Sequence, residues 1–557
     1  MGEGDAGMQA RDRASSGVPQ AAILAASAAA LAAICVLPML AVALAAVLGG
    51  TEILAGLAAT VLPGYVATTL TLAALVAAGT FVIGTGTAWL VTACDFPLRR
   101  AFEFALVLPL AYPAYVLAYA YTHVLDHPGI VQTALRSATG WGPRDYWFPE
   151  IRSLGGAAAM LVLVLYPYVY LLARAAFLQQ GGSAFAIART LGRGPVAAWL
   201  HVSLPMARPA IAGGVLLAVM ETIADYGTVA HFGVRTFATG IYTAWFSIGD
   251  RAAAAQLALG LLGFALLLVL LERATRAGRG AYAGRSVRRP PARAALRGGA
   301  AAGAALLCAA PVVLGALLPG VILAAMAVGS GQDVLSARYM DFVGSSVTLA
   351  GIAALVTVGA AIVLGYRQRL APGRGAALAA SLARIGYAVP GGVIAVGLLV
   401  PFAAFDNALD AFLRARFDIS TGLLLTGSIW LLVAAYAIRF LASALGAWEG
   451  GQATLSPNMD AAARVLGQSP LGMLRRVHLP ILSPSVLTAL LIVFVDVMKE
   501  LPATLIMRPF GWDTLAVQAH RLASDERLGG AAVPSLMIVA VSLAPVILLV
   551  RRIGREA

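Results

Sequence analysis

Charged side chains are scarce in this chain of 557 residues: 12% are Asp, Glu, Lys or Arg, whereas 60% are hydrophobic. The mean hydropathy of +0.85 means that the apolar surface exceeds what a water-soluble core can bury. The composition therefore predicts a chain whose main solvent is lipid. The formal net charge is +13, but the basic residues lie in short runs between apolar segments, so we expect no nucleic acid among the partners.

Cysteine and lysine are nearly absent. The three cysteines, Cys35, Cys94 and Cys308, are isolated, and no CxxC spacing indicates a metal or redox site. The single lysine, Lys499, does not follow a glycine, so the chain lacks the nucleotide-binding motif GxxxxGK[ST]. GxSxG and HExxH motifs are also lacking. The sequence thus predicts a protein that is not an enzyme, that binds no cofactor itself and for which no metal ligands are firmly assigned.

Long apolar runs fill most of the sequence. Runs long enough to cross a bilayer begin near residues 21, 64, 102, 154, 208 and 255, and again near 301, 343, 382, 422, 484 and 533. They predict an all-α membrane protein with about 12 transmembrane helices, six in each half. Arginines such as Arg100, Arg174, Arg369, Arg439 and Arg551 follow the even-numbered runs, so the positive-inside rule places these connections and both termini in the cytoplasm.

The two halves of the chain repeat each other. At an offset of 275 residues, ARTLGRGPVAAWLHVSLPMARPAI from residue 188 aligns without a gap with ARVLGQSPLGMLRRVHLPILSPSV from residue 463. At an offset of 277, TLTLA at residue 69 meets SVTLA at residue 346. We interpret residues 1–272 and 300–557 as two six-span repeats joined by an Arg-rich cytoplasmic linker over 273–299. Because each repeat has an even number of spans, the two repeats are parallel.

A polar segment follows the fourth span of each repeat, at about 183–205 and 458–480. It reads small-small-Arg-x-Leu-Gly, then nine residues, then Val-x-Leu-Pro. The glycine suits a helix C-cap, and the proline three residues later suits a first helical position. We therefore expect two short helices, the second of which ends at Pro205 or Pro480. The pattern resembles the EAA loop of permeases in ATP-binding-cassette (ABC) importers.

In the resembled family, this loop docks on the ATPase subunit. The resemblance implies coupling residues at the matching positions of both repeats. They are Arg189, Gly192, Leu204 and Pro205 in the first repeat and Asp460, Arg464, Gly467, Leu479 and Pro480 in the second. The chain departs from the family pattern at the motif's glutamate, which is replaced by Ala186 and Ala461, although Asp460 lies beside the latter.

Acidic residues interrupt the fifth span of each repeat. The residues of this kind are Glu221 and Asp225 in the first repeat and Asp496 and Glu500, together with Lys499, in the second. Intramembrane acids normally face a bundle interior or a wet path, so we predict that these five residues line the translocation path. The alternative is that the acids hold helices together by pairing with Lys499 or with hydroxyls such as those of Thr222 and Thr504.

Two stretches narrow the resemblance further. METIADYGTVAHFGVRTFATGIYTAWFSIGD, from residue 220, and DVMKELPATLIMRPFGWDTLAVQAHRLASDERL, from residue 496, look like the fused permeases of ferric-iron importers. The resemblance implies Fe(III) delivered by a periplasmic substrate-binding protein, a cytoplasmic ABC ATPase dimer that uses ATP and Mg, and a location in the bacterial inner membrane. The alternatives are an importer of thiamine, a polyamine or an inorganic anion and, from a different class, a secondary transporter.

Overall fold

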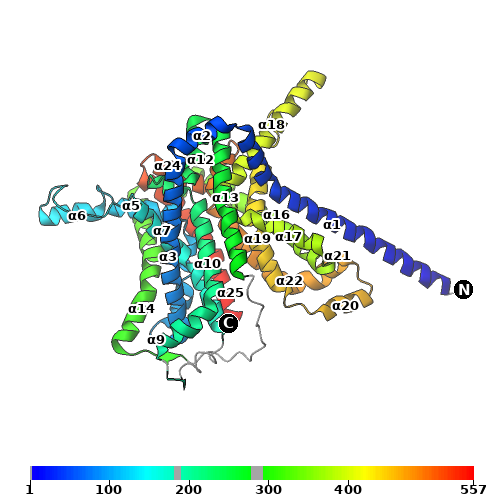
Figure 1. The fold of residues 1–557 in the computed structure, drawn as a ribbon, viewed down its shortest axis with the longest axis horizontal. Helices are drawn as coiled ribbons and strands as arrows, with labels where there is room; N and C mark the ends of the chain where they lie inside the picture. Colours follow the sequence, from blue (N-terminus) through cyan, green and yellow to red (C-terminus); the bar gives the residue numbers. More distant parts are fainter. Residues whose placement is uncertain (1–2, 181–189, 193, 277–292, 557) are drawn as a thin grey trace. The chain divides into compact units, whose positions relative to one another are not determined.

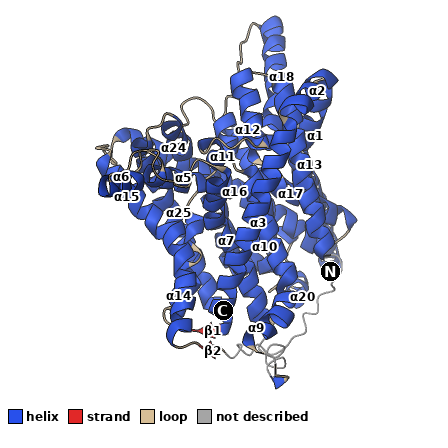
Figure 2. Ribbon diagram, turned by 60° about the vertical axis from the view of Figure 1, so that its left-hand side comes forward, coloured by secondary structure: helices blue, strands red, loops and turns tan. Residues whose placement is uncertain are grey.

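The computed structural model describes residues 3–180, 190–192, 194–276 and 293–556. Helices make up most of these ranges (Figures 1 and 2), together with one parallel pair of two-residue strands. Within these ranges, 11 helices are long and apolar enough to cross a membrane, or up to 12 if Arg99–Ala111 and Ala114–Thr139, bent by 90° against each other, form one span. The structure thus confirms the predicted all-α, multi-span membrane fold.

The helices and strands are numbered in chain order. The elements before the linker are α1 (Glu3–Leu48), α2 (Thr51–Thr60), α3 (Leu62–Ala93), β1 (Cys94–Asp95), α4 (Arg99–Ala105), η1 (Leu108–Ala111), α5 (Ala114–Leu125), α6 (Ile130–Thr139), α7 (Leu154–Gln179), α9 (Pro195–Ala198), η2 (Trp199–Ser203), α10 (Leu204–Ala224), α11 (Gly227–His231), α12 (Phe237–Tyr242), η3 (Thr243–Ile248) and α13 (Arg251–Arg276). The later elements are β2 (Ala294–Ala295), α14 (Gly298–Val312), η4 (Val313–Leu317), α15 (Leu318–Gly329), α16 (Ala337–Leu370), α17 (Arg374–Ala388), α18 (Gly391–Phe417), α19 (Ile429–Gln452), α20 (Pro457–Val465), α21 (Pro470–Met473), η5 (Leu474–His478), α22 (Leu479–Met498), α23 (Pro502–Met507), α24 (Leu515–Ser524) and α25 (Leu528–Glu556). The elements η2 to η5 are π-helical turns, and η1 is a 3₁₀ turn.

The order of elements follows the repeat that the sequence contains. The succession α9, η2, α10 and α11 begins at residues 195, 199, 204 and 227, and α21, η5, α22 and α23 begin at 470, 474, 479 and 502. Each element therefore starts 275 residues after its counterpart. The two repeats fold alike locally around their fifth spans, whereas the boundaries of the predicted domains at 272 and 300 stay predictions.

Packing divides the chain into two compact units that do not coincide with the repeats. Unit 1 contains Met1–Ala45 and Gly344–Trp512, and unit 2 contains Ala46–Val343 and Asp513–Ala557. In unit 1, helix α1 from the first repeat therefore packs with helices of the second repeat. Gly397 of α18 marks a close approach to α1, because a Cβ added there would overlap the backbone of Pro38. Only glycine fits at such a crossing.

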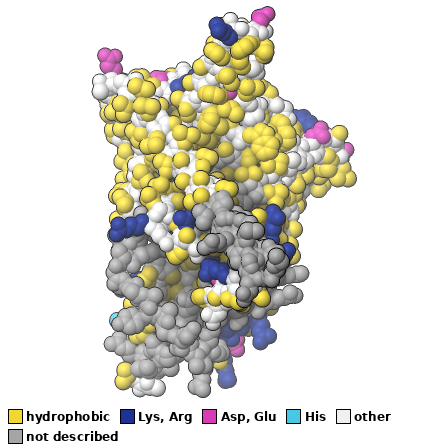
Figure 3. Space-filling view, turned by 90° about the vertical axis from the view of Figure 1, so that its right-hand side faces the viewer, with side chains coloured by type: hydrophobic (Ala, Val, Ile, Leu, Met, Phe, Trp, Pro, Cys, Tyr) yellow, Lys and Arg dark blue, Asp and Glu magenta, His cyan; other side chains and the backbone are white. Residues whose placement is uncertain are grey.

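Several spans are apolar on both their buried and their exposed sides. In α3, Val76 and Ala88 are fully buried, whereas Val82 is 65% exposed. The buried side contains Gly84, where an added Cβ would lie 2.6 Å from Val169 of α7. Hydrophobic side chains also predominate on the described surface drawn in Figure 3. Such helices contact protein on one side and lipid on the other, which explains the high hydropathy of the sequence.

Candidate functional site: the fifth spans and the coupling segments

The fifth span of the first repeat ends at one of the predicted path acids. Helix α10 stops at Ala224, and Asp225 has an extended backbone (φ −68°, ψ 130°). Its Oδ1 accepts hydrogen bonds from the backbone N–H groups of Thr228 (3.0 Å) and Val229 (3.2 Å), and its Oδ2 accepts one from the Thr228 hydroxyl (3.0 Å). The Asp225 carboxylate therefore satisfies the free N–H groups in the first turn of α11.

The second repeat has the same bend with a glutamate in place of the aspartate. Glu500 follows α22, and its carboxylate accepts hydrogen bonds from the N–H groups of Ala503 (2.8 Å) and Thr504 (3.0 Å) at the start of α23. The Thr504 hydroxyl donates a further bond to Oε2 at 2.7 Å. In addition, Arg439 Nη1 of α19 lies 3.4 Å from Glu500 Oε1, and both side chains are almost entirely buried. This bend therefore combines a helix cap with a buried ion pair.

Arg439 is a functional candidate that the sequence reasoning placed wrongly. The positive-inside pattern assigns it to a cytoplasmic connection, but it lies within the spanning helix α19 and is 8% exposed. An arginine inside a span is costly unless an acid neutralises it. Glu500 supplies that acid from the bend after α22, 61 residues further along the chain, and no short-range signal connects the two.

The other path candidates also have contacts. Lys499 Nζ lies 2.9 Å from Asp496 Oδ1, and the two side chains are 21% and 17% exposed. Glu221 lies one turn before Asp225, and the Thr222 hydroxyl donates to the carbonyl of Ala218 in its own helix at 2.7 Å. The contacts of Asp496 with Lys499 and of Glu500 with Thr504 are among those expected if the acids hold helices together. The lining of a path by these residues stays a prediction.

Aromatic and histidine side chains gather near Asp225 in unit 2. The hydroxyl of Tyr119 on α5 lies 3.4 Å from His520 Nδ1, and its ring packs edge-on against His231 at 4.8 Å between centroids. Burial lowers the pKa of His231 and His520 to about 4, so both rings are neutral at pH 7. Among the residues that the structure describes, no three His, Cys, Asp or Glu side chains are placed to hold a metal ion.

The glycines of both coupling segments have the expected conformation. Gly192 and Gly467 have φ values of +83° and +72°, in the left-handed region that favours glycine. Helix α20 ends just before Gly467, whose N–H donates to the carbonyl of Arg464 at 2.9 Å. The corresponding helix of the first repeat, together with Arg189, lies outside the described residues. The docking role of the two segments stays a prediction.

The expectation that Pro205 and Pro480 end the second short helix is wrong. The chain continues helically from Val196 to Ala224 in the first repeat and from Pro470 to Met498 in the second. A π-helical turn precedes each proline, with the N–H of Leu204 or Leu479 donating to a carbonyl five residues earlier. The wider turn accommodates a proline ring that a regular α-helix would exclude, so each coupling segment leads directly into its span.

Apolar side chains are exposed beside both glycines. Leu191 and Leu466 occupy the same position of the two repeats, and each is 78% exposed. Val196 and Leu471, which also correspond, are 57% and 46% exposed. Exposed apolar side chains at matching positions of the two coupling segments are typical of a protein–protein docking surface.

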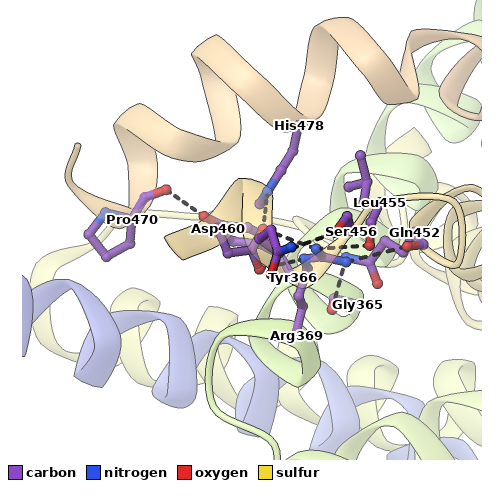
Figure 4. A network of polar contacts seen from close by, with 10 residues as sticks. Gly365, Tyr366, Arg369, Gln452, Leu455, Ser456, Asp460, Pro470 and His478 are labelled. Carbon is purple, nitrogen blue, oxygen red and sulfur yellow. Dashed lines mark hydrogen bonds and ion pairs between the residues drawn. The ribbon is translucent and has the colours of Figure 1, made fainter. Parts of the chain in front are cut away.

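Asp460 faces the interior of unit 1 rather than a docking surface. Its carboxylate pairs with Arg369 of α16 and with His478 of η5 (Figure 4). Burial is the largest influence on the pKa of Asp460 and would raise it, but the hydrogen bonds from Arg369 and His478 together outweigh it and hold the pKa below its usual value. The carboxylate that was expected to lie near the missing motif glutamate is thus engaged within the chain.

A second charged cluster lies in unit 2, on loops that the positive-inside rule places outside the cell. Arg152 donates two hydrogen bonds of 2.7 Å to the carboxylate of Glu526 and one of 2.9 Å to Asp126. The hydrogen bond from Arg152 lowers the pKa of Glu526. Asp126 and Arg152 also line a cavity of about 370 Å³, with His127 and Glu150. The cluster joins loops that are 374 residues apart in the sequence.

Comparisons with known proteins agree with this architecture. No family model matches the chain. The chain is 25% identical over 491 residues to the Fe(3+)-transport system permease protein FbpB 2 of Haemophilus influenzae. This alignment covers 86% of this chain and 88% of the relative. It is 27% identical over 435 residues to the probable ABC transporter permease protein y4fN of Sinorhizobium fredii, covering 73% and 72%. It is also 26% identical over 195 residues to the molybdenum transport system permease protein ModB of Escherichia coli, covering 33% and 80%.

The spanning helices, the repeated fifth spans and these relatives define a class of protein. The chain is a multi-pass membrane protein that resembles the permease subunits of ABC transporters. Within that class, its resemblance to a ferric-iron transport permease extends over nearly the whole chain, including both repeats.

Proposed function

We propose that the chain is the permease subunit of an ABC importer that carries ferric iron across the bacterial inner membrane. The observation that carries this proposal is the similarity to a ferric-iron transport permease over 86% of the chain. In this proposal, a periplasmic substrate-binding protein delivers the iron and a separate cytoplasmic ATPase dimer, which uses ATP and Mg, drives its passage. The N- and C-termini lie in the cytoplasm, in agreement with the arginine distribution.

The coupling segments provide the docking surface for the ATPase dimer. The exposed pair Leu191 and Val196 of the first repeat and the pair Leu466 and Leu471 of the second each present apolar surface that a groove of the partner can cover. Because the helices that begin at Val196 and Pro470 continue without a break into α10 and α22, a displacement of these helices moves the fifth spans directly. The permease thus supplies the translocation path and the helices that transmit the movement, and ATP hydrolysis by the ATPase supplies the free energy.

The bends of the fifth spans would place the acids along the path. Glu221 and Asp225 in one repeat and Asp496 and Glu500 in the other introduce negative charge where the spans end, which favours a cation electrostatically. Part of this charge is already used, because Asp225 and Glu500 cap short helices and Asp496 pairs with Lys499. A cargo that reached these acids would therefore compete with the contacts that hold the bends.

The proposal is tested by uptake of radiolabelled Fe(III) into proteoliposomes that contain the chain, the ATPase and the binding protein encoded beside it. We expect uptake that requires ATP and that is lost when Leu191→Asp and Leu466→Asp are combined, because the charges prevent docking. Trp147→Ser removes an apolar side chain that is 85% exposed in a predicted outer loop and should leave uptake unchanged. An inserted chain that binds no ABC ATPase would contradict the proposal.

The second candidate is an importer of an inorganic anion, which the similarity to a molybdenum transport permease favours. Uptake of radiolabelled molybdate by the same vesicles, with no uptake of iron, would select this candidate. Thiamine and a polyamine are tested in the same assay. A secondary transporter would show uptake without ATP, driven by an ion gradient, and so differs from all of these importers.

A further inference from the structure

A polar network joins the second coupling segment to the end of α16 (Figure 4). Arg369, in the last turn of α16, donates from Nε to Asp460 Oδ2 at 2.9 Å and from Nη2 to Oδ1 at 3.0 Å. His478 Nε2 lies 2.9 Å from the same Oδ1. The Arg369 guanidinium also donates to the backbone carbonyls of Gln452 and Leu455, at 3.3 and 3.4 Å. One side chain of α16 therefore holds α20 and the end of α19.

The network is buried, which makes its geometry strict. Asp460 is 7% exposed and His478 is fully buried. A carboxylate buried in this way is unfavourable unless it is paired and hydrogen-bonded. Two parallel bonds from one guanidinium fix both the distance and the orientation of the partner. A further bond of 2.6 Å from the Tyr366 hydroxyl to the Pro470 carbonyl joins α16 to the start of α21.

The first repeat has no charged residues at the matching positions. These positions are Thr92, Phe185 and Ser203. The Thr92 hydroxyl donates within its own helix, to Ala88. Instead, the end of α3 contacts η2 through the rings of Trp89 and Trp199, whose centroids are 5.2 Å apart. An apolar contact of this kind is not directional and tolerates sliding, whereas the bidentate pair of the second repeat does not.

We propose that Arg369 is a positioning residue that locks the second coupling segment to α16 through Asp460, so that α16 follows a displacement of this segment. This inference rests on the proposed function, because it assumes that an ATPase displaces the segments. A push on α20 then moves α16, which crosses the membrane from Ala337 to Leu370, together with the end of α19.

The test combines a measurement on the chain alone with one on the assembled transporter. Hydrogen exchange of the amides in residues 457–467 is measured in lipid nanodiscs for the wild type, Asp460→Asn, Arg369→Gln and the charge-reversed double variant Arg369→Asp/Asp460→Arg. Arg384→Gln is the matched control, because it removes an arginine of unit 1 whose pair with Glu449 is only partly buried. For each variant, the Kd of the ATPase and the cargo moved per ATP hydrolysed are also measured.

We expect exchange in 457–467 to rise at least tenfold in both single variants and to stay unchanged in the control. The Kd of the ATPase should stay within about twofold, because the exposed apolar residues are intact, whereas cargo moved per ATP should fall at least fivefold. The double variant should restore part of both losses, because it re-forms the ion pair but not the bonds to the carbonyls of Gln452 and Leu455. A merely structural role would instead weaken the Kd of the ATPase together with the cargo moved per ATP. Unchanged exchange in Asp460→Asn, or a double variant as poor as the single ones, would overturn the inference. A wild-type chain that binds no ATPase would instead contradict the proposed function. The exchange data would then still show whether Arg369 and Asp460 hold residues 457–467 in place.

Discussion

The two repeats bend their fifth span at the same position but stabilise the bend with different chemistry. In the first repeat, Asp225 caps the short helix α11 through hydrogen bonds alone, and within the described part of the chain it forms no ion pair. In the second repeat, Glu500 caps α23 and also pairs with the buried Arg439. Both repeats thus have a carboxylate that caps the short helix, because the free backbone N–H groups require an acceptor. The two repeats differ in charge pairing, which the backbone does not require.

A similar divergence separates the two coupling segments. Among the described residues, the second segment contacts the end of α16 through the pair of Arg369 and Asp460, whereas the first contacts the end of α3 through two tryptophan rings. In both comparisons, the second repeat is the one held by directional ionic contacts. We therefore expect substitutions in the second repeat to have larger effects than their counterparts in the first.

The largest effect is expected for Glu500→Ala. This substitution removes the cap of α23 and takes the Glu500 carboxylate away from the buried Arg439, which costs about 3 to 5 kcal/mol in the free energy of unfolding. Thermal denaturation of the purified chain in detergent measures the loss. Adding Arg439→Leu should recover much of the stability, because the buried charge that lost the Glu500 carboxylate is then gone. A single variant as stable as the wild type would show that the ion pair does not hold the bend.

The next effect is expected for Gly467→Pro in the second coupling segment. Proline has φ near −65°, whereas Gly467 has φ of +72°, and proline also lacks the N–H that bonds to Arg464. We expect a loss of more than about 1 kcal/mol in local stability and uncoupling of ATP hydrolysis from uptake, with the chain still inserted. Gly192→Pro is the counterpart in the first repeat. Retained ATPase binding and transport in the Gly467 variant would contradict the coupling assignment.

A smaller effect is expected for Asp225→Ala. Loss of a helix cap costs about 1 kcal/mol, and no buried cation is left unpaired. Asp225→Asn keeps an oxygen acceptor and should recover about half of the loss. Denaturation midpoints of the two variants, compared with that of Glu500→Ala, measure the difference between the repeats directly. Equal losses at residues 225 and 500 would remove the basis of the comparison.

The smallest effect concerns the pair of Arg152 and Glu526, which lies outside the spans and is partly exposed. Because the pKa of Glu526 is lowered in the folded chain, the pair contributes stability above the unfolded pKa of about 4.3 and loses it as the pH falls through the folded value. The wild type should therefore lose more thermal stability than Glu526→Gln between about pH 5 and pH 3. Parallel curves for the two proteins would show that this ion pair adds nothing, as many exposed pairs do.

Local and periodic features of this chain are readable from its sequence. The number and order of spans follow from runs of apolar residues, because the bilayer requires about 20 of them per helix. The left-handed glycines at 192 and 467 follow from a pattern of neighbouring residues, because a helix C-cap is a local structure. The helical passage through Pro205 and Pro480 was missed, because the π-helical turns that accommodate these prolines leave no pattern in the sequence.

The partners of the charged side chains could not be predicted in the same way. The sequence pattern assigns both Arg439 and Arg369 to cytoplasmic connections. In the structure, Arg439 lies inside a span and pairs with Glu500, whereas Arg369 pairs with Asp460 of the second coupling segment. Their acids are 61 and 91 residues away, so only the packing of helices brings them together. His231 and His520, which share Tyr119, are separated by an even longer stretch of chain.

The sequence by itself thus determined a helical membrane chain with two repeats, two coupling segments and acids in the fifth spans, because hydropathy, charge bias and glycine and proline spacing act locally. The tertiary structure decided which of those acids cap a helix, which pair with an arginine, and that α1 packs with helices of the second repeat. The physical reason is that burying a charge or a helix face requires a partner, and the chain selects that partner by proximity in space rather than in sequence.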